Sequence, residues 1–160
     1  MSAATGRRLS CERLADLDSA REDWERLAAL GGNVFATWEW ASAWWRHHGE
    51  GREPVLLGCR DEAGALVGIV PLYVATSRPR VLRFIGHGAG DELGPACVPA
   101  DRAAVAAATR AALAELGVGW DVLVAENLPG DEAWGAFGGR QLSRIPNPIL
   151  EIDGMSWDDY

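Results

Sequence analysis

The sequence predicts a mixed α/β fold of the α+β type, with a mostly antiparallel central sheet flanked by helices on both faces. Two segments with helical periodicity, 18–31 and 37–48, come first, and three strand-like segments follow within residues 54–86. A third helical segment, 99–117, then precedes another apolar strand at 120–126. Along the chain, segments whose apolar residues recur at helical spacing alternate with short segments that would be apolar on both faces of a strand. This order is typical of helices packed on a sheet.

Length, composition and charge describe one soluble domain. A chain of 160 residues is long enough to form a hydrophobic core that needs no disulfide or metal for stability. Its composition, 48% hydrophobic and 24% charged residues, is that of an ordinary globular protein. The formal net charge of −8 argues against a nucleic-acid partner, because phosphate backbones attract a basic surface. No apolar run approaches membrane-spanning length, and the N-terminus lacks the apolar core of a signal peptide. We therefore expect a cytoplasmic protein with no membrane partner.

The three cysteines, Cys11, Cys59 and Cys97, are odd in number and far apart. This pattern fits a reduced cytosol better than a disulfide framework. None of the three lies in a spacing typical of metal ligands, so we predict no metal site.

The N-terminal part predicts a helix after a short lead-in. Residues 1–15 read as a frayed lead-in or an edge strand. From Asp18 a helix begins, with Ser19 and Glu22 spaced as a capping box, and Gly31 ends it. Its apolar stripe contains Leu17, Ala20, Trp24, Leu27 and Ala28.

A second helix, from Thr37 to His48, is unusually rich in tryptophan, and Gly49 closes it. One arc of this helix carries Trp38, Trp40, Ala41, Trp44, Trp45 and His48. The arc either docks the helix on the sheet or forms an aromatic wall of a ligand groove, with Trp40 and Trp44 as candidate substrate-binding residues. His48 reads as a packed side chain near the helix end or, alternatively, as a catalytic group.

The segment around which the chain is organised contains three strands, 54–60, 66–75 and 80–86. The link 61–65 is short, polar and contains a glycine, which is the signature of a hairpin. The middle strand is apolar on both faces and should lie inside the sheet. Because Pro71 sits in its middle and has no backbone N–H, we expect the sheet to open there through a bulge or a splayed neighbour, leaving a cleft.

The C-terminal part predicts a short helix at 131–137 and two strands, at 141–145 and 148–152. We expect a single domain over residues 1–155. Residues 156–160 have the S-x-x-[DE] form that begins a helix, so we expect them to lead into a further domain that this chain does not contain. A natural terminus is the alternative.

The order of these elements resembles the GCN5-related N-acetyltransferase (GNAT) fold. Segments 34–40 (with Trp44 and Trp45), 66–73 and 81–86 look like the N-terminal half of the CelD-type, FemAB-related acetyltransferases of the cellulose-biosynthesis type, over roughly residues 20–160. The resemblance implies acyl transfer from acetyl-CoA, or another activated acyl donor, to an amine on a small molecule, a peptide or a sugar. It also implies that this chain supplies the acceptor groove and contacts a second GNAT-like domain.

Within the resemblance, residues 83–88 match the coenzyme-binding pattern [QR]-x-x-G-x-[GA], which makes Gly86 and Gly88 candidate cofactor-binding residues. The context differs from the family, because Arg83 lies in a predicted strand and the next helix begins only near Pro99. We therefore expect the missing domain to hold the coenzyme.

The glycine-rich loop 86–95 carries the candidate catalytic residues His87, Asp91 and Glu92, which could bind a cationic amine or accept its proton. Pro71 and Tyr73, with the two tryptophans above, are the candidate substrate-binding residues. In the alternative interpretation the loop is flexible and its acids are solvated. A self-sufficient small GNAT enzyme that uses this loop, and a catalytically silent binding or assembly module that docks through the tryptophan-rich helix, are the other hypotheses.

Overall fold

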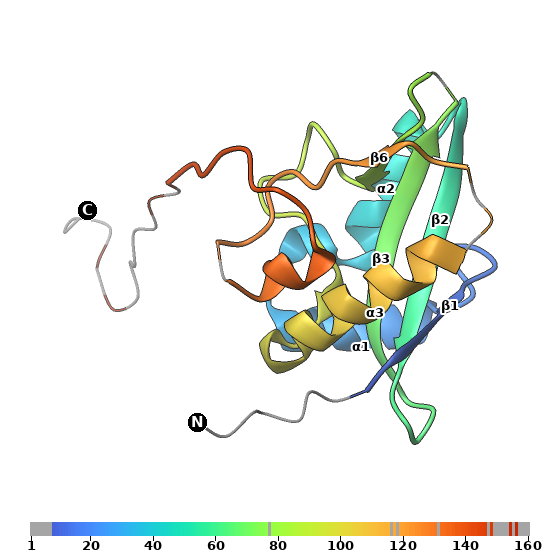
Figure 1. The fold of residues 1–160 in the computed structure, drawn as a ribbon. Helices are drawn as coiled ribbons and strands as arrows, with labels where there is room; N and C mark the ends of the chain where they lie inside the picture. Colours follow the sequence, from blue (N-terminus) through green and yellow to red (C-terminus); the bar gives the residue numbers. More distant parts are fainter. Residues whose placement is uncertain are drawn as a thin grey trace.

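The structure is a computed structural model in which residues 8–76, 78–115, 117, 119–130, 132–146, 148, 154 and 156 are described. Figure 1 shows two long central strands with helices packed against them. The elements are β1 (Ser10–Arg13), α1 (Arg21–Gly31), η1 (Val34–Ala36), α2 (Trp38–His48), β2 (Arg52–Arg60), β3 (Leu66–Ala75), β4 (Val81–Phe84), β5 (Ala96–Cys97), η2 (Pro99–Asp101), α3 (Arg102–Glu115), β6 (Val122–Leu123) and η3 (Glu132–Phe137). This order confirms the predicted α+β class.

The strands form one mixed sheet in the order β1-β2-β3-β4-β6, and β5 also pairs with β3. All pairs are antiparallel except β4 with β6, which run parallel. Parallel neighbours need a crossover connection, and α3 provides it between these two strands. The hairpin of β2 and β3 lies at the centre, where the sequence predicted it.

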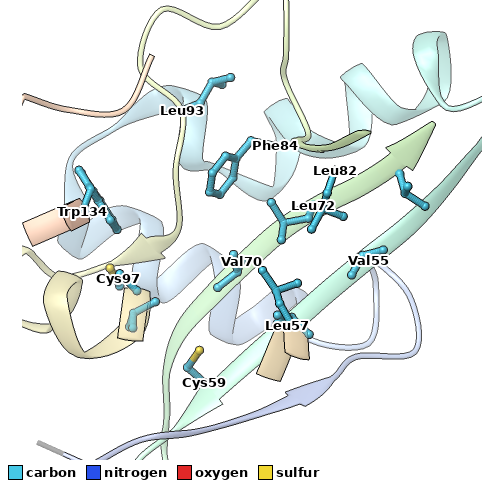
Figure 2. Packing of buried hydrophobic residues seen from close by; sticks show 14 residues of the cluster. Val55, Leu57, Cys59, Val70, Leu72, Leu82, Phe84, Leu93, Cys97 and Trp134 are labelled. Atoms are coloured by element: carbon cyan, nitrogen blue, oxygen red, sulfur yellow. The ribbon is translucent and has the colours of Figure 1, made fainter. Parts of the chain in front are cut away.

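Two apolar clusters lie on opposite faces of β2 and β3, since successive side chains of a strand alternate between faces. One cluster contains Val55, Leu57, Val70, Leu72, Val105, Ala106 and Leu113, so α3 packs on this face. Figure 2 shows members of this cluster on the strands, such as Val70 and Leu72, together with Leu93 and Trp134 from segments outside the central hairpin. The other cluster contains Trp24, Leu27, Ala41, Trp44, Leu56, Ile69 and Tyr73, which brings α1 and α2 together. In Figure 1, α3 lies in front of the sheet and α1 and α2 lie behind it.

The sheet around Pro71 is continuous on one edge of β3 and interrupted on the other. The ladder between β2 and β3 passes through the pair Leu56 and Pro71 without a break. On the opposite edge, the Ile85 amide donates to the Pro71 carbonyl at 2.8 Å, so the proline nitrogen also faces this edge. The missing donor therefore costs the central hairpin nothing. The expectation that the sheet opens here is wrong for the β2 edge and correct for the β4 edge.

The size of this interruption follows from the strand register. Leu72 pairs with Phe84 of β4, whereas Ile69 pairs with Ala96 of β5. These two pairs are three residues apart on β3, from Leu72 to Ile69, but twelve residues apart on the partner segment, from Phe84 to Ala96. The partner segment therefore contains 12 − 3 = 9 residues more than the ladder can pair. The glycine-rich loop is this excursion, and β5, which the sequence did not predict, is where the chain returns to the sheet.

The predicted capping box at the start of α1 is wrong. The helix begins at Arg21, and its N-cap residue, Ala20, has no side chain that could accept a hydrogen bond. Ser19 is engaged in an earlier turn, where its amide donates to the Asp16 carboxylate at 2.7 Å and its hydroxyl donates to the Asp16 carbonyl at 2.8 Å. The acidic residue Glu22 is still in the first turn, which suits the helix dipole.

The C-terminal part contains less regular structure than predicted. The expected helix is the 3₁₀ turn η3, and β6 is only two residues long. The predicted strand 141–145 is wrong, since these residues form no strand pairing with the described part of the chain and are exposed; Leu142 is 84% and Ile145 79% exposed. The predicted strand 148–152 and the helix start at 156–160 lie outside the described residues, apart from positions 148 and 156.

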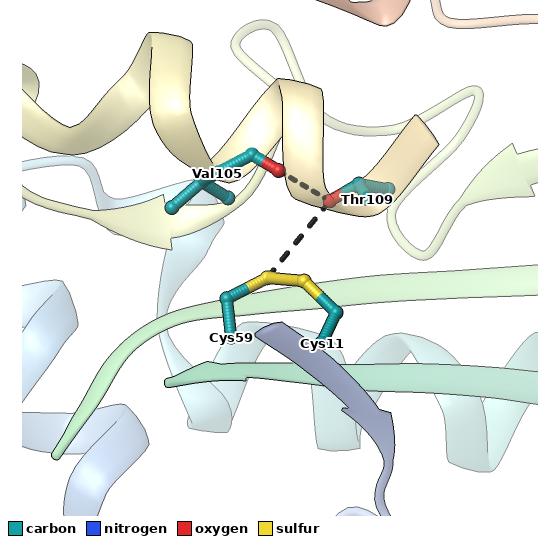
Figure 3. Close-up of a disulfide and its surroundings, with 4 residues drawn as sticks. All are labelled: Cys11, Cys59, Val105 and Thr109. Atoms are coloured by element: carbon teal, nitrogen blue, oxygen red, sulfur yellow. Dashed lines mark hydrogen bonds between the residues drawn. A yellow bond between two sulfur atoms is a disulfide. The ribbon is translucent and has the colours of Figure 1, made fainter. Parts of the chain in front are cut away.

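A disulfide joins Cys11 and Cys59, so the prediction of three reduced cysteines is wrong (Figure 3). The two residues are directly opposite in the β1–β2 ladder, with Cα atoms 4.1 Å apart. A sequence separation of 48 hides this pairing until the edge strand is placed beside β2. Because structural disulfides persist mainly in oxidising compartments, the bond gives the expectation of a cytoplasmic location no support. No helix within the described residues has the length and apolarity needed to cross a membrane.

Candidate functional site

His87 lies in the middle of a chain of polar contacts at the point where the loop leaves β4. Its Nδ1 atom is 3.5 Å from the Tyr73 hydroxyl. Its Nε2 atom is 2.8 Å from Oε2 of Glu126, and the Arg83 guanidinium donates to the same oxygen at 2.6 Å. A titratable ring is thus held between a phenol and a carboxylate, which is the kind of arrangement that general acid–base chemistry uses.

The sheet topology explains why these side chains meet. Tyr73 and Arg83 are paired residues of β3 and β4. Glu126 follows β6, whose Leu123 pairs with Leu82 of β4. Because β4 and β6 run parallel, their C-terminal ends lie at the same edge of the sheet, and the side chains that follow them come together. The crossover through α3 therefore brings Glu126 beside a residue 43 positions away in sequence, Arg83.

The members of this chain differ in accessibility. Tyr73 is buried, with 2% of its surface exposed. The side chains of His87 and Glu126 keep 35% and 45% of their surface, and Arg83 keeps 25%. A ligand can therefore reach the imidazole and the carboxylate. The buried tyrosine instead positions the imidazole ring through its hydroxyl. No group of three or more metal-ligating side chains that could hold an ion occurs among the residues that the structure describes.

Trp44 holds the backbone of the candidate base. Its indole N–H donates to the His87 carbonyl at 3.2 Å, and its ring lies 5.2 Å from the Tyr73 ring and 5.2 Å from the His48 ring. Because Trp44 is buried, it fixes the loop rather than offering an open face to a ligand. The His48 ring contacts Trp44, but the residue is exposed and not packed as predicted.

Trp40 also packs against the loop. A Cβ atom at Gly86 would lie 2.9 Å from the Trp40 Nε1 atom, and the Trp40 ring meets Phe35 edge to face at 4.9 Å. The tryptophans of α2 are buried or half-buried, and no tryptophan in the described part of the chain is exposed. The hypothesis of a module that docks through this helix therefore finds no exposed aromatic surface there.

Three amides at the start of the loop have local backbone partners. His87 N donates to the Phe84 carbonyl, and the amides of Ala89 and Gly90 donate to the Gly86 carbonyl at 3.1 and 2.9 Å. Both Gly86 and Gly88 have positive φ angles, 102° and 82°, but β5 and η2 separate them from the start of α3. Their amides therefore do not form a phosphate cradle at a helix N-terminus.

The other two predicted catalytic residues lie further along the loop. Asp91 is exposed, and Glu92 is tied down through its backbone carbonyl, which accepts from the Asn33 amide at 3.0 Å. Neither carboxylate forms a hydrogen bond or ion pair with His87, whose acidic partner is Glu126. Sequence reasoning missed Glu126, although a single charge at the end of an apolar strand was the signal that could have identified it.

The cleft that was expected beside His87 has no support. One crevice, with an interior of about 10 Å³, lies between α1 and the 93–97 segment and touches Cys97 and Trp134. A second, more open hollow lies over the start of α1. His87 lines neither of them. We therefore define the candidate site by its contact chain.

No protein-family model matches this chain, and no curated protein or solved structure matches it at a significant level. The class of protein that fold and site define is a mixed α+β domain with a Tyr73–His87–Glu126 contact chain at the edge of its sheet.

Proposed function

We propose that the protein is a GNAT-type N-acyltransferase domain that binds the amine acceptor and receives its proton. The contact chain of Tyr73, His87 and Glu126, beyond the C-terminal ends of the parallel strands β4 and β6, carries this proposal. The order of elements also supports it, because two helices, a three-strand meander, a crossover helix and a parallel strand follow one another as the GNAT resemblance implies.

The chemistry needs a group that binds an ammonium ion and a group that removes a proton from it. The Glu126 carboxylate, 45% exposed, is the anionic group that an ammonium ion would approach. As the ammonium replaces His87 beside this carboxylate, Nε2 becomes available to accept the proton, and Tyr73 keeps the ring in place through Nδ1. The neutral amine would then attack the thioester carbonyl. The C–S bond would break and one N–H proton of the attacking amine would pass to the leaving sulfur, which gives the amide and the free thiol.

The donor coenzyme is assigned to a second GNAT-like domain. The amides of His87, Ala89 and Gly90 already have backbone partners, and the loop is also bonded to the segment that follows β6. Leu93 N donates to the Asn127 carbonyl at 2.8 Å, and the Asn127 side chain donates to the Gly90 carbonyl at 2.9 Å. A pantetheine arm running between the two strands would have to break both bonds.

The test follows acceptor binding at His87 by NMR of the labelled imidazole. A panel of protonated amines that includes an alkylamine, a lysine-containing peptide and an amino sugar should shift the His87 resonances saturably. The variant Glu126→Gln should abolish the shift, because it removes the charge but keeps the shape. Glu50→Gln, a change at an exposed acid outside the site, is the matched control and should behave like the parent protein.

Calorimetric titration with acetyl-CoA tests the division of labour and should give no binding heat. Tight binding of acetyl-CoA to this chain would overturn the assignment of the coenzyme to another domain. A panel in which no amine moves the His87 signals, or one in which E126Q responds like the parent, would refute the proposed acceptor site.

A further inference from the structure

We propose that the acceptor is an amine that also carries a carboxylate, and that Arg52 recognises this second group. The inference rests on the proposed function, because it names the class of acceptor for the same site. It starts from the position of the Arg52 guanidinium, whose central carbon lies 5.5 Å from the Tyr73 ring centre and 5.7 Å from the Trp44 ring centre. These are the two rings that hold His87.

The Arg52 guanidinium is held in place by more than one contact. Arg52 is the first residue of β2 and pairs with Ala75 of β3, so its backbone is part of the central hairpin. Its side chain also donates to the carbonyl of His48, at the end of α2. A guanidinium stacked on aromatic rings and bonded to one carbonyl keeps its remaining N–H donors for another acceptor. The Arg52 guanidinium is thus positioned beside the site and still has N–H groups that can donate to a ligand.

Arg52 differs from the neighbouring arginines in its partners. Arg13 and Arg80 share the Glu53 carboxylate, at 3.3 and 3.2 Å, and Arg83 is paired with Glu126 at 2.6 Å. Within the described residues, Arg52 forms no ion pair with a carboxylate of this chain, and it is exposed. In a protein with a formal net charge of −8, a positioned cation that lacks an acidic partner is the natural place for an external carboxylate.

The two charges that an acceptor would meet are linked to different nitrogens of the imidazole. Glu126 contacts Nε2, whereas Tyr73 contacts Nδ1 and carries Arg52 over its ring. An ammonium on the Glu126 side and a carboxylate on the Arg52 side would orient the acceptor across His87. Such two-point binding places the nitrogen for attack more firmly than a single ion pair does.

The experiment compares ligands that differ only in the carboxylate. Affinities for 4-aminobutyrate and n-butylamine are measured through the His87 imidazole signals, and glycine, β-alanine and 6-aminohexanoate then show which spacing fits. We expect the best amino acid to bind about tenfold more tightly than the plain amine, as one charge-assisted hydrogen bond allows. In Arg52→Gln the two affinities should converge, and in Arg52→Lys the preference should be intermediate because the planar fork is lost.

Arg46→Gln is the matched control, since Arg46 is an exposed arginine in the last turn of α2, the helix whose end Arg52 contacts, and has no place in the site. It should keep the full preference. Equal affinities for amino acid and amine in the parent protein would overturn this inference and leave the proposed function standing. A preference lost equally in R46Q and R52Q would overturn it too, because general charge would then explain the effect. Failure of every amine to bind would remove the proposed function itself.

Discussion

Two glycines of the same loop provide a matched test of how the site is built. Gly86 and Gly88 both have positive φ angles, 102° and 82°, so alanine at either position is strained. They differ in their surroundings. A Cβ atom at Gly86 would lie 2.8 Å from Leu93 Cδ2 and 2.9 Å from Trp40 Nε1, whereas a Cβ atom at Gly88 would meet nothing within 4 Å.

The expected costs follow from this difference. Gly88→Ala should lower the free energy of unfolding by about 1–2 kcal/mol, the cost of a left-handed conformation for an L-residue. Gly86→Ala should lose the same amount and a further ~1–3 kcal/mol, because Leu93 and Trp40 are packed around the position and must shift.

Urea unfolding followed by tryptophan fluorescence measures both costs, and the His87 imidazole signals report whether the loop has moved. The chemical shifts of His87 should change strongly in G86A and little in G88A. If the two variants lose the same stability, or if G88A is the more damaging, the packing described for Gly86 is wrong.

Three further predictions concern the core. Replacing Cys11 and Cys59 by serine opens a loop of 48 residues and should cost about 4 kcal/mol by chain entropy, measured as the difference in urea unfolding between the oxidised parent and the double variant; an unchanged midpoint would contradict the bond. Gly68→Ala should cost about 1–3 kcal/mol in the same assay, because its Cβ atom would lie 2.7 Å from Val105 Cγ2. Trp24→Phe removes the donor to the Ala36 carbonyl and should cost at least about 1–3 kcal/mol in thermal unfolding; a cost near zero would show that water replaces the indole.

The elements that the sequence predicted well are those whose local pattern and tertiary setting agree. The long strands β2 and β3 are apolar on both faces and lie inside the sheet. In α2 the hydroxyl of Thr37 accepts from the Trp40 amide at 3.2 Å, so the cap and the tryptophan stripe point to the same helix. The Ser19 hydroxyl could either cap a helix or stabilise an earlier turn, and the sequence pattern favoured the helix cap, which is wrong.

The features that escaped prediction depend on contacts between distant segments. Strand β5 contains only two residues and exists because Ala96 and Cys97 return to the free edge of β3. The disulfide needs β1 in register with β2. Glu126 becomes a partner of His87 only after the crossover places β6 beside β4. No periodicity or spacing carries this information, because register is set by the whole sheet.

Because of the position of Pro71, the pairing of the central hairpin does not depend on the loop that carries the candidate site. Since the imino nitrogen faces the β4 side, the central hairpin is complete without any contribution from the nine-residue excursion. Substitutions and changes of length in that excursion can therefore accumulate while the hairpin stays intact, provided that Leu93 keeps its buried anchor. The fold would tolerate an exchangeable recognition segment at this point, and related chains could acquire new specificities there without rebuilding their core.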